Sequence, residues 1–139
     1  MSHIHRLVTA LALLGLLFTG TAYAQEKQKL FINLASDHPW RMEMALTFAG
    51  AVLARGTGVT VWLNNEGVRV GKAQSEGQLK KASQMLADLI NKGARVVVCG
   101  ECLRQFAINE RQLLPGATVG RVDTTIALLL DANTQVLSW

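Results

Sequence analysis

The segment that decides the fold of this chain reads Val96-Val97-Val98-Cys99-Gly100-Glu101-Cys102-Leu103. Three consecutive β-branched residues predict a short strand buried on both faces, as in a parallel sheet. Gly100 permits a sharp change of direction after the strand, and the apolar spacing of Leu103, Phe106 and Ala107 predicts a helix beyond it. The segment therefore indicates a strand–turn–helix unit of an α/β protein.

The same segment contains the only two cysteines of the chain, Cys99 and Cys102. At this spacing both sulfur atoms lie on one face of the helix start, where free backbone N–H groups and the helix dipole favour a thiolate. Glu101 opposes thiolate formation, and Arg104 can offset its charge. We expect any chemistry of the protein to be built on this pair.

On both sides of this segment, short apolar runs alternate with longer amphipathic ones. Strands are expected at 30–35, 59–63, 95–98, 118–121 and 134–139, and helices at 39–54, 78–91 and 123–132, with a long loop at 64–77. Asp123 is expected to cap the last helix. The alternation predicts a three-layer α/β/α fold around a mainly parallel five-stranded sheet. In this interpretation, residues 25–139 form a single domain.

Right-handed crossovers place the loops that follow the strands along one edge of such a sheet, where ligands of α/β proteins usually bind. The polar loops at 36–38 and 64–66 would share this edge with the cysteine turn. His38, the only histidine after residue 24, could act on Cys99 as a base or ion-pair partner, or be a solvated residue at a helix start. The long loop has three charged residues that could cover the site or simply be solvated: Glu66, Arg69 and Lys72.

The first 24 residues match the three-part pattern of a secretory signal peptide. Arg6 precedes an apolar run at 7–18, and Ala22-Tyr23-Ala24 is a small-x-small cleavage site before Gln25. A membrane anchor is the alternative, but the run is shorter than the about 20 residues that span a bilayer. We therefore expect cleavage, a periplasmic or secreted protein, and no stable membrane insertion afterwards.

The composition narrows the possible partners. The formal net charge is +4, which slightly favours small anions, and no cluster of basic residues with interleaved aromatics predicts nucleic-acid binding. A closed zinc site needs four ligands, whereas the chain after residue 24 has two cysteines and one histidine. We expect neither a metal nor a cofactor.

The cysteine pair also admits inert interpretations, either a stabilising disulfide or two buried thiols. A bridge across so short a loop restricts the unfolded chain little, and the strand–helix junction is an unusual place for inert thiols. A thioredoxin-type motif is disfavoured, because no tryptophan precedes Cys99 and no proline separates it from Cys102. Redox or sulfur chemistry is the favoured interpretation.

Three motifs of the chain together resemble a known family. They are the C-x-x-C turn at 98–102, the glycine-rich loop at 67–77 before a leucine-rich helix, and the tail at 126–139. In this combination the chain resembles the DsrE/DsrF-like family over about 29–139. The resemblance implies a three-layer α/β/α fold, trimers or hexamers, and relay of sulfane sulfur as a cysteine persulfide at Cys99. The predicted leader and the second cysteine depart from the well-understood cytoplasmic relays.

The leading hypothesis is an exported sulfur-carrier or sulfurtransferase-like protein in which Cys99 holds a persulfide. Cys102 could attack that persulfide, release sulfide and leave a disulfide. A second hypothesis is a thiol–disulfide redox protein that never carries sulfur. The third is a non-catalytic oligomeric module that binds a small anion. The sulfur donor and acceptor are not indicated by the sequence.

A homo-oligomer is also predicted from the helix at 39–54. One apolar stripe has spacing four, and a second is rotated well round the helix, whereas packing on a sheet needs one stripe. The stripes are Trp40, Met44, Phe48 and Val52, and Met42, Leu46, Ala49 and Leu53. The segment at 126–130 has the same apolar excess. A subunit interface would cover surface that monomers rarely expose.

Overall fold

A computed structural model describes residues 27–139 of the 139-residue chain. The predicted signal peptide at 1–24 and its cleavage site lie outside these residues, and both stay predictions. Between residues 27 and 139, the structure contains no helix with the length and apolar character needed to cross a bilayer.

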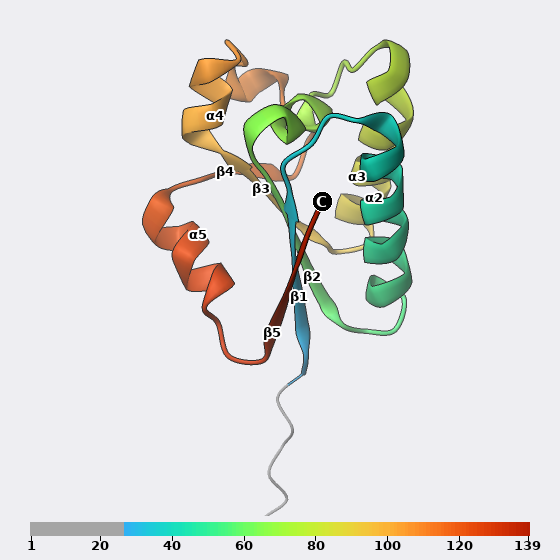
Figure 1. The fold of residues 1–139 in the computed structure, drawn as a ribbon, viewed down its shortest axis with the longest axis vertical. Helices are drawn as coiled ribbons and strands as arrows, with labels where there is room; N and C mark the ends of the chain where they lie inside the picture. The colour runs from blue at the N-terminus through green and yellow to red at the C-terminus, as the bar shows by residue number, and fades with distance from the viewer. Residues whose placement is uncertain (1–26) are drawn as a thin grey trace, which may run out of the picture.

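Five strands alternate with helices along the described chain (Figure 1). The strands are β1 (Lys29–Leu34), β2 (Gly58–Leu63), β3 (Arg95–Cys99), β4 (Ala117–Gly120) and β5 (Thr134–Ser138). The α-helices are α2 (Pro39–Leu53), α3 (Lys80–Asn91), α4 (Gly100–Gln105) and α5 (Val122–Leu129). Short 3-10 helices are η2 (Asn65–Gly71), η3 (Gly77–Leu79) and η4 (Glu110–Gln112). Each predicted strand and helix is present, with its bounds shifted by no more than three residues.

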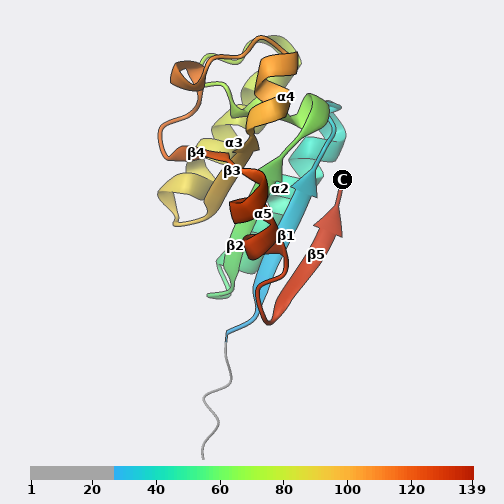
Figure 2. The ribbon, with the colours of Figure 1, turned by 90° about the vertical axis from the view of Figure 1, so that its left-hand side faces the viewer.

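All five strands run parallel in the order β4-β3-β2-β1-β5, which confirms the predicted sheet. The chain moves from β1 to β4 in one direction and then returns to place β5 beside β1. Because parallel crossovers are right-handed, this return puts α5 on the face opposite α2 and α3. The result is the predicted three-layer α/β/α arrangement (Figures 1 and 2).

The core lies between the sheet and the helices α2 and α3. Alternate residues of the central strands enter it, because side-chain direction has a period of two along a strand. Ile32, Val61 and Val98 are each 0% exposed, as are Met42 of α2 and Leu86 of α3. On the other side of β3, Val97 is only 4% exposed. β3 is therefore buried on both faces, as its β-branched run predicts.

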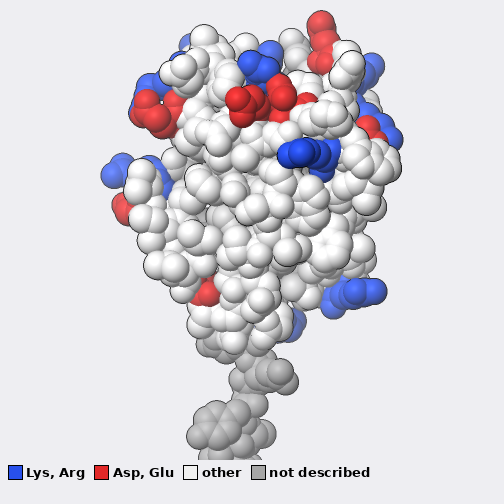
Figure 3. Space-filling model, in the orientation of Figure 1, with Lys and Arg blue, Asp and Glu red and all other residues white. Residues whose placement is uncertain are grey.

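The apolar surface outside this core is extensive. No residue of α5 is buried, and Ile126 is 48% exposed. On α2, Trp40, Met44 and Phe48 are exposed by 66%, 40% and 44%. Figure 3 shows few charged side chains over the central and lower part of the face formed by α5, β5 and α2. The excess of apolar surface predicted from the two stripes of α2 is present in the fold.

Residues 64–77 are not the open loop that the sequence suggests. They begin with η2, in which Val68 and Val70 are fully buried. A Cβ atom on Gly67 would lie 2.2 Å from the carbonyl oxygen of Leu34, so this glycine allows close packing of η2 on the end of β1. Gly67 therefore permits close packing of the segment, and the apolar side chains anchor the segment to the core.

The prediction that Asp123 caps the last helix is wrong. Arg121 occupies the N-cap of α5, and the Thr124 hydroxyl donates to the Arg121 carbonyl over 3.0 Å. Asp123 lies in the first turn, 3.5 Å from Nε of Arg121. The helix simply begins earlier than its polar residues suggest, and its N-terminus is stabilised by Thr124.

Candidate thiol site at the carboxyl edge of the sheet

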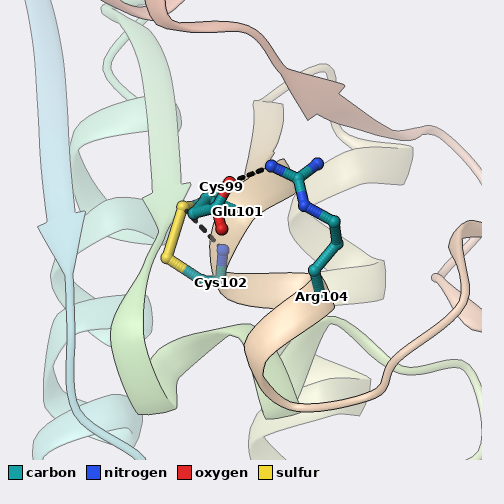
Figure 4. Close-up of polar contacts among 4 residues, drawn as sticks. All are labelled: Cys99, Glu101, Cys102 and Arg104. Carbon is teal, nitrogen blue, oxygen red and sulfur yellow. Dashed lines mark hydrogen bonds and ion pairs between the residues drawn. A yellow bond between two sulfur atoms is a disulfide. The ribbon is translucent and has the colours of Figure 1, made fainter.

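The site is built where β3 ends and α4 begins. Cys99 is the last residue of the strand and the N-cap of α4, and Cys102 lies in the first turn of that helix. The two sulfur atoms form a disulfide, with Cα atoms 5.2 Å apart (Figure 4). Both cysteines are half-buried. The predicted pairing of the cysteines on one side of the turn is therefore present.

Each sulfur accepts a hydrogen bond from a backbone N–H group. Cys102 N–H donates to Sγ of Cys99 over 3.2 Å, and Asn65 N–H donates to Sγ of Cys102 over 3.3 Å. Asn65 has φ of 43°, a left-handed conformation that asparagine tolerates better than most residues. Hydrogen bonds of this kind favour the charged form of the acceptor, so they favour a thiolate once the pair is reduced.

Gly100 provides space for close packing, and it does not provide the left-handed turn that the sequence suggests. Its φ is not in the left-handed region. A Cβ atom at this position would lie 3.0 Å from Cγ1 of Val119 on β4, tighter than ordinary contact. Glycine at position 100 therefore lets the first turn of α4 pack closely against β4, where a larger residue would have to displace Val119.

The charges beside the cysteines compensate one another. Arg104 donates to the carboxylate of Glu101, one turn earlier on the exposed side of α4 (Figure 4). This is the pairing that the sequence analysis considered. Because both side chains are largely exposed, the pair screens the Glu101 charge and contributes little to stability.

Three polar side chains link the neighbouring strand ends, and one of them is buried. Asn64 is 7% exposed, and its Nδ2 donates to Oδ1 of Asn33 over 2.5 Å. Asn33 Nδ2 donates in turn to Oγ of Ser138 over 3.3 Å. The cluster thus links the ends of β1, β2 and β5 immediately before Asn65. The one buried member, Asn64, thus has a hydrogen-bond partner, as buried polar side chains generally do.

Arg69 joins the loops that follow β1 and β3. Its NH1 group lies 2.6 Å from Oδ2 of Asp37, and its guanidinium lies over the Phe106 ring at 4.6 Å from the centroid. The sequence predicts Arg69 to be a loop residue that either covers the site or is solvated, and it indicates neither of these partners. The only available signal was the pair of valines flanking Arg69, which indicates a packed segment.

His38 is not brought into the hydrogen-bonded network of the cysteines. It is the exposed N-cap residue of α2, and its backbone N–H donates to Oγ of Ser36 over 3.1 Å. Between residues 27 and 139, its imidazole has no hydrogen-bond or ion-pair partner. Its predicted role toward Cys99 stays a prediction, whereas its neighbour Asp37 contacts Arg69 of the site.

Two cavities differ in their relation to the cysteines. The larger has a volume of about 350 Å³ and lies at the amino ends of the strands, at the opposite edge of the sheet from the cysteines. Its wall includes Lys29, Thr60 and Arg95. The smaller, of about 200 Å³, is lined by Arg69 and Phe106 among others. Phe106 follows Cys102 by one helical turn, so the smaller cavity adjoins the site. Within the described residues, no group of three or more acidic, histidine or cysteine side chains is placed to hold a metal ion.

The fold and site together define a parallel α/β protein with a disulfide-forming C-x-x-C pair at the carboxyl end of β3. The chain matches the DsrE/DsrF-like family over residues 27–137, and it belongs to that family. The resemblance inferred from its motifs is therefore confirmed.

Relatives and solved structures agree with this assignment. An uncharacterised protein of Methanocaldococcus jannaschii is 31% identical over 110 residues, covering 76% of this chain and 96% of the relative. A second uncharacterised protein, from Methanopyrus kandleri, is 31% identical over 105 residues, covering 73% of this chain and 87% of the relative.

Two solved structures share the fold. A protein of unknown function from Methanobacterium thermoautotrophicum superposes with a TM-score of 0.70 at 18% identity, covering 81% of this chain and 100% of that one. The ychN protein of E. coli superposes with a TM-score of 0.68 at 19% identity, covering 81% of this chain and 99% of that one. At these identities the likeness concerns the fold alone.

Proposed function

We propose that the protein relays sulfane sulfur as a persulfide on Cys99. The family is related to sulfur relay, and the two cysteines of this chain form a close pair. The observation that carries the proposal is the position of that pair, at the end of β3 with a backbone N–H donated to each sulfur. These contacts support a nucleophilic thiolate.

The relay exchanges one S–S bond for another. The Cys99 thiolate attacks the outer sulfur of a persulfide or polysulfide donor, the S–S bond of the donor breaks, and the donor leaves as a thiolate. Cys99 then holds the sulfur as a persulfide anion. An acceptor thiolate attacks this outer sulfur, and the Cys99 sulfur leaves as a thiolate. No net oxidant or reductant is needed.

Cys102 provides a second reaction by which the persulfide can lose its outer sulfur. Its thiolate can attack Sγ of Cys99, so that hydrosulfide leaves and the disulfide of this structure forms. The two cysteines supply the two electrons that reduce the sulfane sulfur to sulfide. An external dithiol, or two small thiols, must then reduce the disulfide before another cycle.

The disulfide favours a second candidate function, thiol–disulfide exchange without sulfur carriage. In that case Cys99 and Cys102 would alternate only between dithiol and disulfide, and neither would hold an added sulfur. Both candidates need the same reactive pair, so the presence of labile sulfur on the protein separates them.

The assembly and the location are part of the proposal. DsrE-like proteins are often oligomeric, and we infer a homo-oligomer, a trimer or hexamer, in which exposed apolar residues of α2 such as Trp40 are covered. We also infer export to the periplasm or outside the cell, on the basis of the leader pattern at 1–24.

Cyanide-labile sulfur tests the relay. The protein is reduced, incubated with inorganic polysulfide, freed of excess reagent and treated with cyanide, and thiocyanate is measured. Cys102→Ser should retain more labile sulfur than the wild type, because it lacks the thiolate that attacks the Cys99 persulfide. Cys99→Ser should retain none. Equal amounts on Cys99→Ser and Cys102→Ser would overturn the assignment of the persulfide to Cys99.

A further inference from the structure

The Arg69 side chain connects three segments around the cysteine pair. It belongs to η2, its guanidinium pairs with Asp37 after β1, and it lies over Phe106 at the C-cap of α4. The ion pair is partly exposed, with side-chain exposures of 44% for Arg69 and 35% for Asp37. Its contribution to overall stability is accordingly small, which leaves local geometry as its main effect.

The two segments η2 and α4 contact each other at two matched points. Asn65 contacts Cys102 at one point, where its N–H lies 3.3 Å from Sγ. Four residues further on each segment, Arg69 contacts Phe106 at 4.6 Å. The apolar side chains of η2 hold it against the core, and this second contact adds a tie to the end of α4 that helps to orient the Asn65 N–H.

We propose that Arg69 is a positioning residue that holds the Asn65 N–H on the sulfur of Cys102 and thereby sets the balance between dithiol and disulfide. An N–H group stabilises a thiolate more than it stabilises the sulfur of a disulfide. Loss of this hydrogen bond should therefore disfavour the reduced pair. The inference rests on the proposed thiol chemistry of Cys99 and Cys102, and it does not require sulfur carriage.

The balance is measured by equilibrating the protein with reduced and oxidised glutathione. Two glutathione thiols reduce the disulfide, giving the protein dithiol and one glutathione disulfide, and alkylation followed by mass spectrometry gives the reduced fraction. For Arg69→Met we expect the constant for protein reduction to fall about tenfold, equivalent to about 30 mV for this two-electron couple. Since no sulfane sulfur is present, failure of the relay proposal would leave this result unaffected.

The chain offers a matched control at the opposite end of the sheet. Lys29 pairs with Asp131 over 2.6 Å, with side-chain exposures of 42% and 41%, close to those of Arg69 and Asp37. Lys29→Met should leave the constant unchanged. Asp37→Asn removes only one attachment of Arg69 and should shift the constant in the same direction by a smaller factor.

A second readout separates positioning from simple destabilisation. In the Cys99→Ser background, alkylation of Cys102 should require higher pH when Arg69 is also changed to Met, because the thiolate has lost its donor. The proposal would be overturned if folded Arg69→Met had the wild-type reduction constant and if Cys102 alkylation were the same in Cys99→Ser with and without Arg69→Met. If Arg69→Met does not fold, an unchanged constant for folded Asp37→Asn would overturn it equally.

Discussion

The backbone N–H of Asn65 lies 3.3 Å from Sγ of Cys102, although the two residues are 37 positions apart in the chain. Asn65 follows β2 and Cys102 follows β3, and these strands are neighbours in the sheet. Parallel strands bring their following segments to one edge, so the fold itself places this donor on the sulfur. The polar surroundings of the pair therefore come from η2 as well as from α4.

The conformation of Asn65 gives the first prediction. With φ of 43°, this position disfavours residues other than asparagine and glycine. Asn65→Ala should lower the free energy of unfolding by about 1 kcal/mol, and Asn65→Gly should lower it less. Urea denaturation of both variants checks this order. Equal stability of Asn65→Ala and the wild type would contradict the left-handed conformation.

A second prediction concerns Gly67, which anchors η2 to β1. A Cβ atom there would meet the Leu34 carbonyl oxygen at 2.2 Å, so Gly67→Ala should destabilise the fold by about 2–3 kcal/mol. Gly58 is the control, because its added Cβ would lie 3.9 Å from Cγ of Lys29, an ordinary contact. Thermal unfolding should show a large loss for Gly67→Ala and a small change for Gly58→Ala; similar values for the two would be inconsistent with the tight packing.

Much of the fold could be predicted from local pattern, because strands and helices have distinct periods of apolar residues. The run Val96-Val97-Val98 and the cysteine turn indicated both the buried strand and the candidate thiols. η2 could not be predicted in the same way. Its glycines are typical of a loop in sequence, and its burial results from packing on β1, which is distant in the chain. The contacts of Arg69 with Asp37 and Phe106 join segments distant in sequence, and a single sequence holds no record of such pairs.

A third prediction addresses the assembly. Phe48 of α2 is 44% exposed, and the centroid of its ring lies 6.0 Å from that of the Trp139 ring. It belongs to the apolar surface that we infer to be an interface. Phe48→Glu should reduce the oligomer mass in light scattering, because a charge in an apolar interface is costly to desolvate. Gln84→Glu, at an exposed position of α3, is the control and should leave the mass unchanged. A wild-type mass equal to one chain would remove the basis of the interface.

The fourth prediction concerns export. Expression of the full chain in a Gram-negative host should give an envelope protein that begins at Gln25, after the Ala22-Tyr23-Ala24 site. N-terminal peptide mass spectrometry of the fractionated cells checks this, and it also detects cyclisation of Gln25. Recovery of envelope protein that still begins at Met1 would argue against a cleavable leader.

Locating the added sulfur tests the central claim most directly. Reduced Cys102→Ser protein is incubated with inorganic polysulfide, alkylated to trap persulfides, and analysed by intact mass and peptide mapping. The relay predicts one added sulfur atom on the peptide containing Cys99, removable by dithiothreitol and absent from Cys99→Ser. No added sulfur on Cys99, under conditions in which its thiol is alkylated normally, would contradict the proposed function.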